Sequence, residues 1–103
     1  MTNHNRNRSK WLNKDIDYLF KSITKLQSTQ DCEKFFRDLL TINEIKSFAE
    51  RLKVANMLNK GSTYKQIEKK TGASSTTIAR INRWLEYGEG GYKLILRRMK
   101  NIK

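Results

Sequence analysis

The sequence of 103 residues contains no proline, and its five glycines are confined to Gly61, Gly72 and the segment 88–91. Because proline interrupts helices, its absence allows helices to run from one glycine to the next. Hydrophobic residues make up 37% of the chain and aromatic residues 10%. This composition predicts a packed, all-α fold rather than a disordered chain.

Cysteine and histidine are nearly absent as well, with Cys32 and His4 as the single examples. One cysteine cannot form an intrachain disulfide, which is compatible with a reducing compartment. One histidine in a polar leader, without a second ligand nearby, gives no support for a metal site. The sequence also lacks paired carboxylates in apolar surroundings, a histidine beside a nucleophile and a glycine-rich phosphate loop. We therefore expect neither an enzyme nor a bound cofactor.

Acidic residues are scarce, because ten Asp and Glu stand against 22 Lys and Arg and leave a formal net charge of +12. Such an excess is typical of proteins that bind a polyanion, with nucleic acid the leading choice. An anionic membrane surface is the competing partner, but no segment approaches the roughly 18 consecutive apolar residues of a membrane span. We expect a cytoplasmic, nucleoid-associated protein with no membrane partner.

The distribution of basic and apolar residues divides the chain into two parts. Residues 1–11 carry Arg6 and Arg8 among polar neighbours and predict a flexible basic arm. In residues 12–103, apolar residues recur at spacings of three and four, which predicts a single domain of six helices without a strand. The first helix is expected to run for about fifteen residues from Asn13. The stripes of the first two helices are Ile16, Leu19, Phe20, Ile23 and Leu26, then Cys32, Phe35, Phe36, Leu39 and Leu40.

A long third helix is predicted to begin after Thr41, which forms a capping box with Glu44, and to end at Gly61. A last amphipathic helix follows the segment 88–91 and carries several basic residues. The inward faces of these helices are expected to be Ile45, Phe48, Ala49, Leu52, Ala55 and Leu58 in the third, and Tyr92, Ile95, Leu96 and Met99 in the last.

Between these helices, the segment YKQIEKKTGASSTTIARINRWLEYG predicts two short helices joined by a tight turn. Thr63 and Gln66 match a capping box, Gly72 can adopt the left-handed conformation of a sharp turn, and Ser74 can cap the next helix. Two helices joined by a short turn containing glycine cross steeply, which is the geometry of the DNA-binding helix-turn-helix.

One side of the second helix of this pair carries Ile78, Ile81 and Leu85, which are expected to pack inward. The opposite side has small polar residues near its start and arginines further along, so it can approach base edges while guanidinium groups reach bases or phosphates. Glu68 on the first helix opposes phosphate contact. The predicted DNA-binding residues are Lys65, Gln66, Lys69, Ser74, Ser75, Thr76, Thr77, Ala79, Arg80 and Arg83.

The run LLTINEIKSFAERLKVANMLNKGSTYKQIEKKTGASSTTIARINRWL resembles the Trp repressor superfamily, and specifically its TrpR-related YerC/YecD family. The likeness covers roughly Leu39 to Leu96. It implies an intertwined homodimer that places two reading helices on a palindromic operator as a transcriptional repressor.

The resemblance also implies a place for a tryptophan pocket, bounded by Thr41, Arg51, Arg80, Ile81 and Trp84. Ile81 stands where the repressor has a glycine that leaves room for the indole, and Trp84 stands where it has a serine. Both larger side chains would occupy the slot, so we predict that tryptophan is not a ligand. A different small-molecule effector is left open.

Three other interpretations compete with DNA binding. The two short helices could form an ordinary helical hairpin with solvated polar residues. The basic arm, together with exposed Trp11, Tyr64 and Tyr87, could serve an RNA-binding module. The same basic face could also meet an acidic protein in an adaptor.

Overall fold

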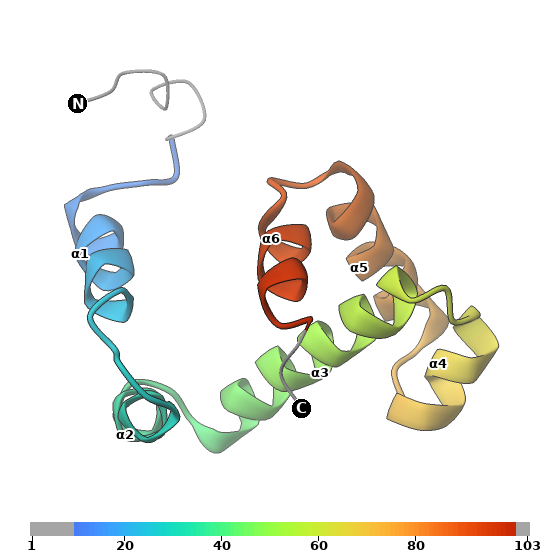
Figure 1. The fold of residues 1–103 in the computed structure, drawn as a ribbon, viewed down its shortest axis with the longest axis horizontal. Coiled ribbons are helices and arrows are strands. Elements are labelled where there is room, and N and C mark those ends of the chain that lie inside the picture. Colours follow the sequence, from blue (N-terminus) through green and yellow to red (C-terminus); the bar gives the residue numbers. More distant parts are fainter. Residues whose placement is uncertain (1–9, 101–103) are drawn as a thin grey trace. The chain divides into compact units, whose positions relative to one another are not determined.

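The computed structural model describes residues 10–100, which form six helices and no strand (Figure 1). This confirms the predicted all-α class. The predicted basic arm lies largely outside the described residues. The helices are α1 (Lys14–Ile23), α2 (Thr29–Leu39), α3 (Ile42–Asn59), α4 (Tyr64–Thr71), α5 (Ser75–Tyr87) and α6 (Gly91–Arg98).

The chain divides into two compact units, of which unit 1 ends at Leu40 and unit 2 begins at Thr41. The prediction that residues 12–103 form a single domain stays a prediction. Unit 1 contains α1 and α2, and unit 2 contains α3 to α6.

Both helices of unit 1 begin at side-chain caps. The Asn13 side chain accepts a hydrogen bond from the Ile16 N–H at 2.8 Å, and the Ser28 hydroxyl accepts one from the Asp31 N–H at 3.0 Å. Asparagine and serine are preferred at this position because they satisfy N–H groups that have no partner within the helix.

Helix α1 is shorter than predicted, with ten residues, and Leu26 lies beyond its end. The Thr24 hydroxyl donates to the Lys21 carbonyl at 2.6 Å, and the N–H groups of Lys25 and Leu26 bond to carbonyls three residues back. These shorter-range bonds tighten the chain and end the α-helix. The prediction placed Leu26 inside the helix because it used only the spacing of apolar residues. That spacing does not show which hydrogen bonds end the helix.

No described side chain of unit 1 is buried, although both helices are amphipathic. Phe20 is 44% exposed and meets the ring of Trp11 edge-on, with centroids 6.0 Å apart. Leu39 is 47% exposed. Unit 1 by itself therefore leaves these apolar side chains uncovered.

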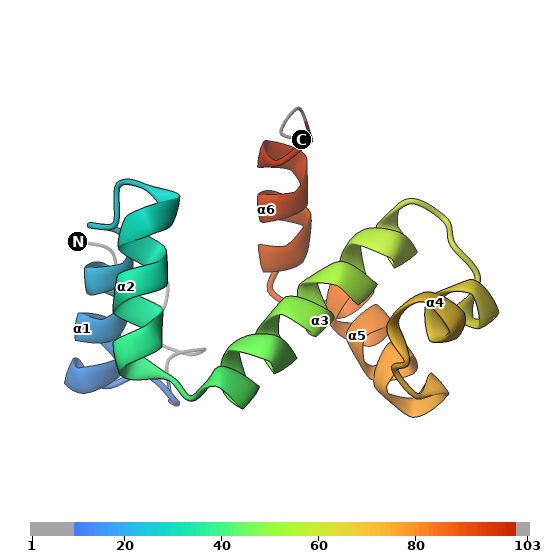
Figure 2. The same ribbon diagram turned by 90° about the horizontal axis from the view of Figure 1, so that it is seen from below.

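The core of unit 2 forms where α3 contacts α4, α5 and α6 (Figures 1 and 2). Its members include Ala55, Ile78, Ile81 and Leu85, as the apolar spacing predicted, and also Ile67. Val54 and Ala73 complete the set of buried residues. Helices α4 and α5 are thus held against the C-terminal half of α3.

The first half of the face predicted for α3 is not covered within unit 2, because Phe48 is 50% and Leu52 40% exposed. Val54, which the predicted stripe omitted, is fully buried. The cause is length: at about 1.5 Å per residue, an 18-residue helix extends well past the eight-residue helices α4 and α6. Only the C-terminal half of α3 is covered by them.

Candidate nucleic-acid interface

A short turn at Gly72 joins α4 to α5. Gly72 adopts φ +78°, in the left-handed region, and its N–H donates to the Glu68 carbonyl at 2.8 Å. A side chain here would be strained even though the space around the glycine is open. The left-handed C-cap predicted from sequence is therefore confirmed.

Thr71 stabilises the same turn through two hydrogen bonds of its hydroxyl group. The sequence analysis did not predict this role. Its hydroxyl donates to the Ile67 carbonyl at 2.8 Å and accepts from the Ala73 N–H at 3.0 Å. Ala73 is buried, with 7% exposure. One hydroxyl thus links the last turn of α4 to the first residue after Gly72. A threonine directly before the glycine was the available signal, since threonine hydroxyls often bond to nearby backbone.

Ser74 caps the N-terminus of α5, and its hydroxyl accepts from the Thr77 N–H at 3.1 Å, as predicted. The same hydroxyl donates to the Thr77 hydroxyl oxygen at 3.0 Å. Both side chains were predicted to contact DNA. Their mutual bond gives each of them a structural task at the helix start.

The two faces of α5 differ in burial as the helical spacing predicted. Ile78, Ile81 and Leu85 are buried. The outer face is exposed over the whole length of the helix, and Tyr87 at its end is 87% exposed. This outer face consists of Ser75, Thr76, Ala79, Arg80, Arg83 and Tyr87.

Helix α4, which contacts α5, also carries exposed cationic side chains. Lys65 and Lys69 are exposed, and so is Glu68, the one carboxylate of the helix. The Gln66 side-chain oxygen accepts from the Thr63 N–H at 2.8 Å, while the Thr63 hydroxyl accepts from the Gln66 N–H at 3.1 Å. This confirms the capping box and leaves the Gln66 side-chain NH₂ free to donate to a ligand.

The five residues of the predicted effector pocket have diverse environments. The Thr41 hydroxyl caps α3 by accepting from the Glu44 N–H at 3.1 Å, and the Arg51 guanidinium lies 5.8 Å from the centre of the Phe48 ring. Ile81 is buried with 1% exposure, while Trp84 is 43% exposed and Arg80 also faces solvent.

Arg51 also acts on Tyr92 of α6. Burial raises the pKa of the Tyr92 phenol above its usual value, and the nearby positive charge of Arg51 lowers that pKa in part. The phenol is therefore protonated at neutral pH. Arg51 therefore lies near Phe48 of its own helix and near Tyr92 of α6.

Neither a metal site nor a membrane-spanning helix is found among the described residues. In residues 10–100, no group of three or more His, Cys, Asp and Glu side chains could hold a metal ion. None of the helices in the same range is long and apolar enough to cross a bilayer. The exposed residues of α4 and α5 include cationic and hydrogen-bonding side chains as well as the carboxylates of Glu68 and Glu86.

Residues 14–100 match the family model described as Trp repressor protein. The chain is 50% identical over 90 residues to the uncharacterised protein YerC of Bacillus subtilis strain 168, covering 87% of this chain and 86% of YerC. A solved TrpR-like protein from Eubacterium eligens superposes with a TM-score of 0.84 at 40% identity, covering 94% of this chain and 98% of the other. A candidate Trp repressor from Staphylococcus aureus gives the same TM-score and identity, with 96% of each chain covered.

The turn geometry predicts that Gly72→Ala lowers the free energy of unfolding by about 1 kcal/mol, because alanine is strained in the left-handed region. Urea unfolding followed by circular dichroism at fixed protein concentration measures this change. Gly91→Ala is the matched control, since Gly91 is the first residue of α6, has open space around it and has no left-handed φ. Equal losses in the two variants would contradict the assigned role of Gly72.

Proposed function

Because the chain belongs to the Trp repressor family, we propose that it is a transcription regulator that binds a specific duplex DNA sequence through α4 and α5. The observation that carries the proposal is the exposed outer face of α5, which follows the turn formed by Gly72 and Thr71. A helix presented in this way fits the width of the major groove.

The residues of the outer face suit different parts of DNA. Ser75, Thr76 and Ala79 are small and lie in the first half of α5, so backbone and hydroxyl groups can come within hydrogen-bonding distance of base edges. Arg80 and Arg83 are long enough to reach guanines or phosphates. In this proposal Ser74 and Thr77 hold the helix start rather than read a base.

Helix α4 acts as the positioning helix in this arrangement. Lys65 and Lys69 meet phosphates and set the register of α5, and the Gln66 NH₂ adds a donor. Glu68 would repel phosphate, so we assign it to a position facing away from the backbone or toward a cytosine amino group.

We further propose that the active form is a homodimer that binds a palindromic operator and represses transcription. Family membership supports this assembly, and each unit has exposed apolar side chains that a second copy could cover: Phe20 and Leu39 in unit 1, and Ile42 and Phe48 in unit 2. A two-fold dimer presents two copies of α5 to successive major grooves about one helical turn apart. Such a regulator would act in the cytoplasm on the nucleoid.

RNA binding is the second candidate function, because the exposed aromatic residues are suited to stacking on unpaired bases. Tyr87 and Tyr18 are 87% and 75% exposed. Duplex DNA remains the preferred ligand because Tyr87 lies beside arginines on one rigid helix, and Tyr18 belongs to the other compact unit.

Selection from a random duplex library at near-physiological salt tests the proposed function directly. We expect a palindromic motif with half-sites about one helical turn apart. Failure to enrich any motif, with affinity that falls steeply as salt rises, would contradict sequence-specific regulation. Preference for RNA hairpins of the same sequence would establish RNA binding instead, and lack of any duplex affinity in low salt would favour a protein adaptor.

Two substitutions separate readout from backbone contact on the selected site. Thr76→Ala is expected to reduce discrimination against mismatched sites while leaving affinity for random DNA unchanged, because the lost hydroxyl serves a base edge. Arg83→Ala should relax specificity by about 1–3 kcal/mol if Arg83 reads a guanine, whereas it should weaken all duplexes equally if Arg83 meets phosphate.

Equilibrium fluorescence anisotropy on matched and mismatched duplexes measures both effects. Arg37→Ala removes the same charge from α2 and should change neither quantity beyond a small electrostatic loss. An unchanged specificity ratio in Thr76→Ala would mean that the N-terminal turn of α5 does not contact bases.

Tryptophan is expected not to bind, because the side chain of Ile81 occupies the protein interior and the Thr41 hydroxyl is engaged in a capping box. Isothermal calorimetry with L-tryptophan should therefore give no saturable heat, both with the free protein and with the protein on its selected duplex. Stoichiometric binding of tryptophan would refute this prediction.

A further inference from the structure

Among residues 75–81, the first half of α5, Ala79 is the one apolar residue that is exposed. The other exposed side chains of this half are polar or charged, and its remaining apolar side chains, Ile78 and Ile81, are buried. We propose that Ala79 determines specificity by packing its methyl group against the C5 methyl group of a thymine in each half-site. This inference rests on the proposed function and deepens it by naming a base that α5 reads.

The side chain of Ala79 can contribute only a methyl group. It has no donor or acceptor, so it cannot recognise a base through a hydrogen bond. In the major groove, guanine, adenine and cytosine present polar nitrogen and oxygen atoms, whereas thymine also presents its C5 methyl group. A methyl group placed against the polar atoms removes water without replacing its hydrogen bonds, but against thymine it buries apolar surface on both sides. Thymine is therefore the base that Ala79 favours.

The neighbours of Ala79 on the outer face allow a close approach to the bases. Ser75 and Thr76 precede Ala79 by four and three residues, so they lie beside it on the same side of the helix. All three side chains are short, and all three residues are exposed. The backbone of α5 can therefore come near the floor of the groove at this point, where the thymine methyl group lies.

A contact between two methyl groups also requires a helix that is held in place, because a gap of about 0.5–1 Å already loses a quarter to a half of the dispersion attraction. Ile78, which directly precedes Ala79, is fully buried in the core of unit 2. The Ser74 hydroxyl caps the start of the helix by accepting from the Thr77 N–H at 3.1 Å. Ala79 therefore lies on a part of α5 that is anchored to the core.

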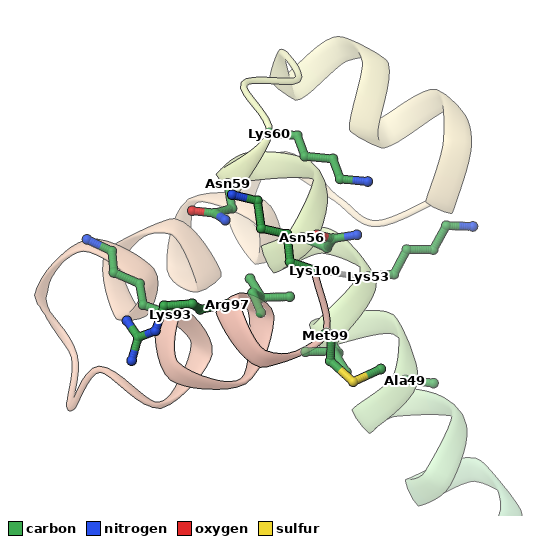
Figure 3. Close-up of a pocket in the computed structure, with 11 residues that line it drawn as sticks. Ala49, Lys53, Asn56, Asn59, Lys60, Lys93, Arg97, Met99 and Lys100 are labelled. Carbon is green, nitrogen blue, oxygen red and sulfur yellow. The ribbon is translucent and has the colours of Figure 1, made fainter. Parts of the chain in front are cut away.

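Cationic side chains elsewhere on unit 2 do not supply this selectivity. Several of them surround the hollow between α3 and α6, where Lys53 and Lys93 point away from each other rather than toward a common ligand (Figure 3). Positive charges spread in this way attract the phosphates of a duplex regardless of its sequence. Preference for one sequence depends instead on groups that contact base edges, and Ala79 is placed among them.

Replacement of thymine by deoxyuridine in the selected duplex tests the proposal without altering the protein. Deoxyuridine lacks only the C5 methyl group and keeps the hydrogen-bonding groups of thymine. Each thymine of one half-site is replaced in turn, and affinity is measured by fluorescence anisotropy. At one position the replacement should weaken binding about threefold to fivefold, because the burial of one methyl group is lost. A selected motif without thymine, or unchanged affinity at every replaced position, would overturn the proposal.

Variants of α5 assign the methyl effect to one residue. Ala79→Gly removes the contacting methyl group, so it should bind the thymine and deoxyuridine duplexes equally well. Thr76→Ser is the matched control, since it removes a methyl group from a neighbouring exposed residue and keeps the hydroxyl. This control should retain the preference for thymine, and loss of the preference in Thr76→Ser would refute the assignment to Ala79.

A second variant is needed because glycine weakens helices. Ala79→Ser keeps a small side chain but places a hydroxyl group beside the thymine methyl group, so it should also remove the preference for thymine over deoxyuridine. Circular dichroism checks that both variants are folded. A preference that persists in either folded variant would mean that DNA shape distinguishes the two duplexes, which contradicts the role of Ala79.

Failure of this inference is distinguishable from failure of the proposed function. A random library that yields no enriched motif would refute both, because the inference requires sequence-specific binding. A selected motif whose thymine methyl groups have no effect on affinity would refute the role of Ala79 alone and leave the proposed regulator intact.

Discussion

The left-handed backbone of Gly72 determines how everything on α5 is presented. If residue 72 were held in the right-handed region, α4 would continue and the outer face of α5 would have no fixed angle to the core. Three local interactions maintain the turn: the Gly72 N–H bond to Glu68, the Thr71 hydroxyl that links Ile67 to Ala73, and the Ser74 cap of α5. Burial of Ile67 and Ile78 then attaches both helices to α3.

The packing of α4 and α5 against α3 provides only a small hydrophobic core. The core of unit 2 is small, and unit 1 has no buried residue among those described. Domains of this size bury a small share of their surface, so stability is expected to depend on association. The apolar faces left exposed on α1, α2 and the first half of α3 are consistent with such association. In the proposed dimer, the same contact would stabilise the fold and set the spacing between reading helices.

Features that depend on near neighbours could be predicted from the sequence. The capping boxes at Thr41 and Thr63, the cap at Ser74 and the left-handed Gly72 each involve residues within four positions of one another. Features that depend on distant segments could not. Apolar spacing identified a stripe containing Phe48 and Leu52 but not which helices would cover it, so Val54 was missed.

The central claim is that the N-terminal half of α5 enters the major groove, and tethered cleavage tests it most directly. An iron chelate attached at Ser75→Cys, in a Cys32→Ser background, cleaves DNA close to the start of α5. On the selected duplex, the account predicts two clusters of cleavage about one helical turn apart, one in each half-site. A chelate at Lys46→Cys should give no such pattern. Uniform cleavage from Ser75→Cys, or the same pattern from both positions, would contradict the account.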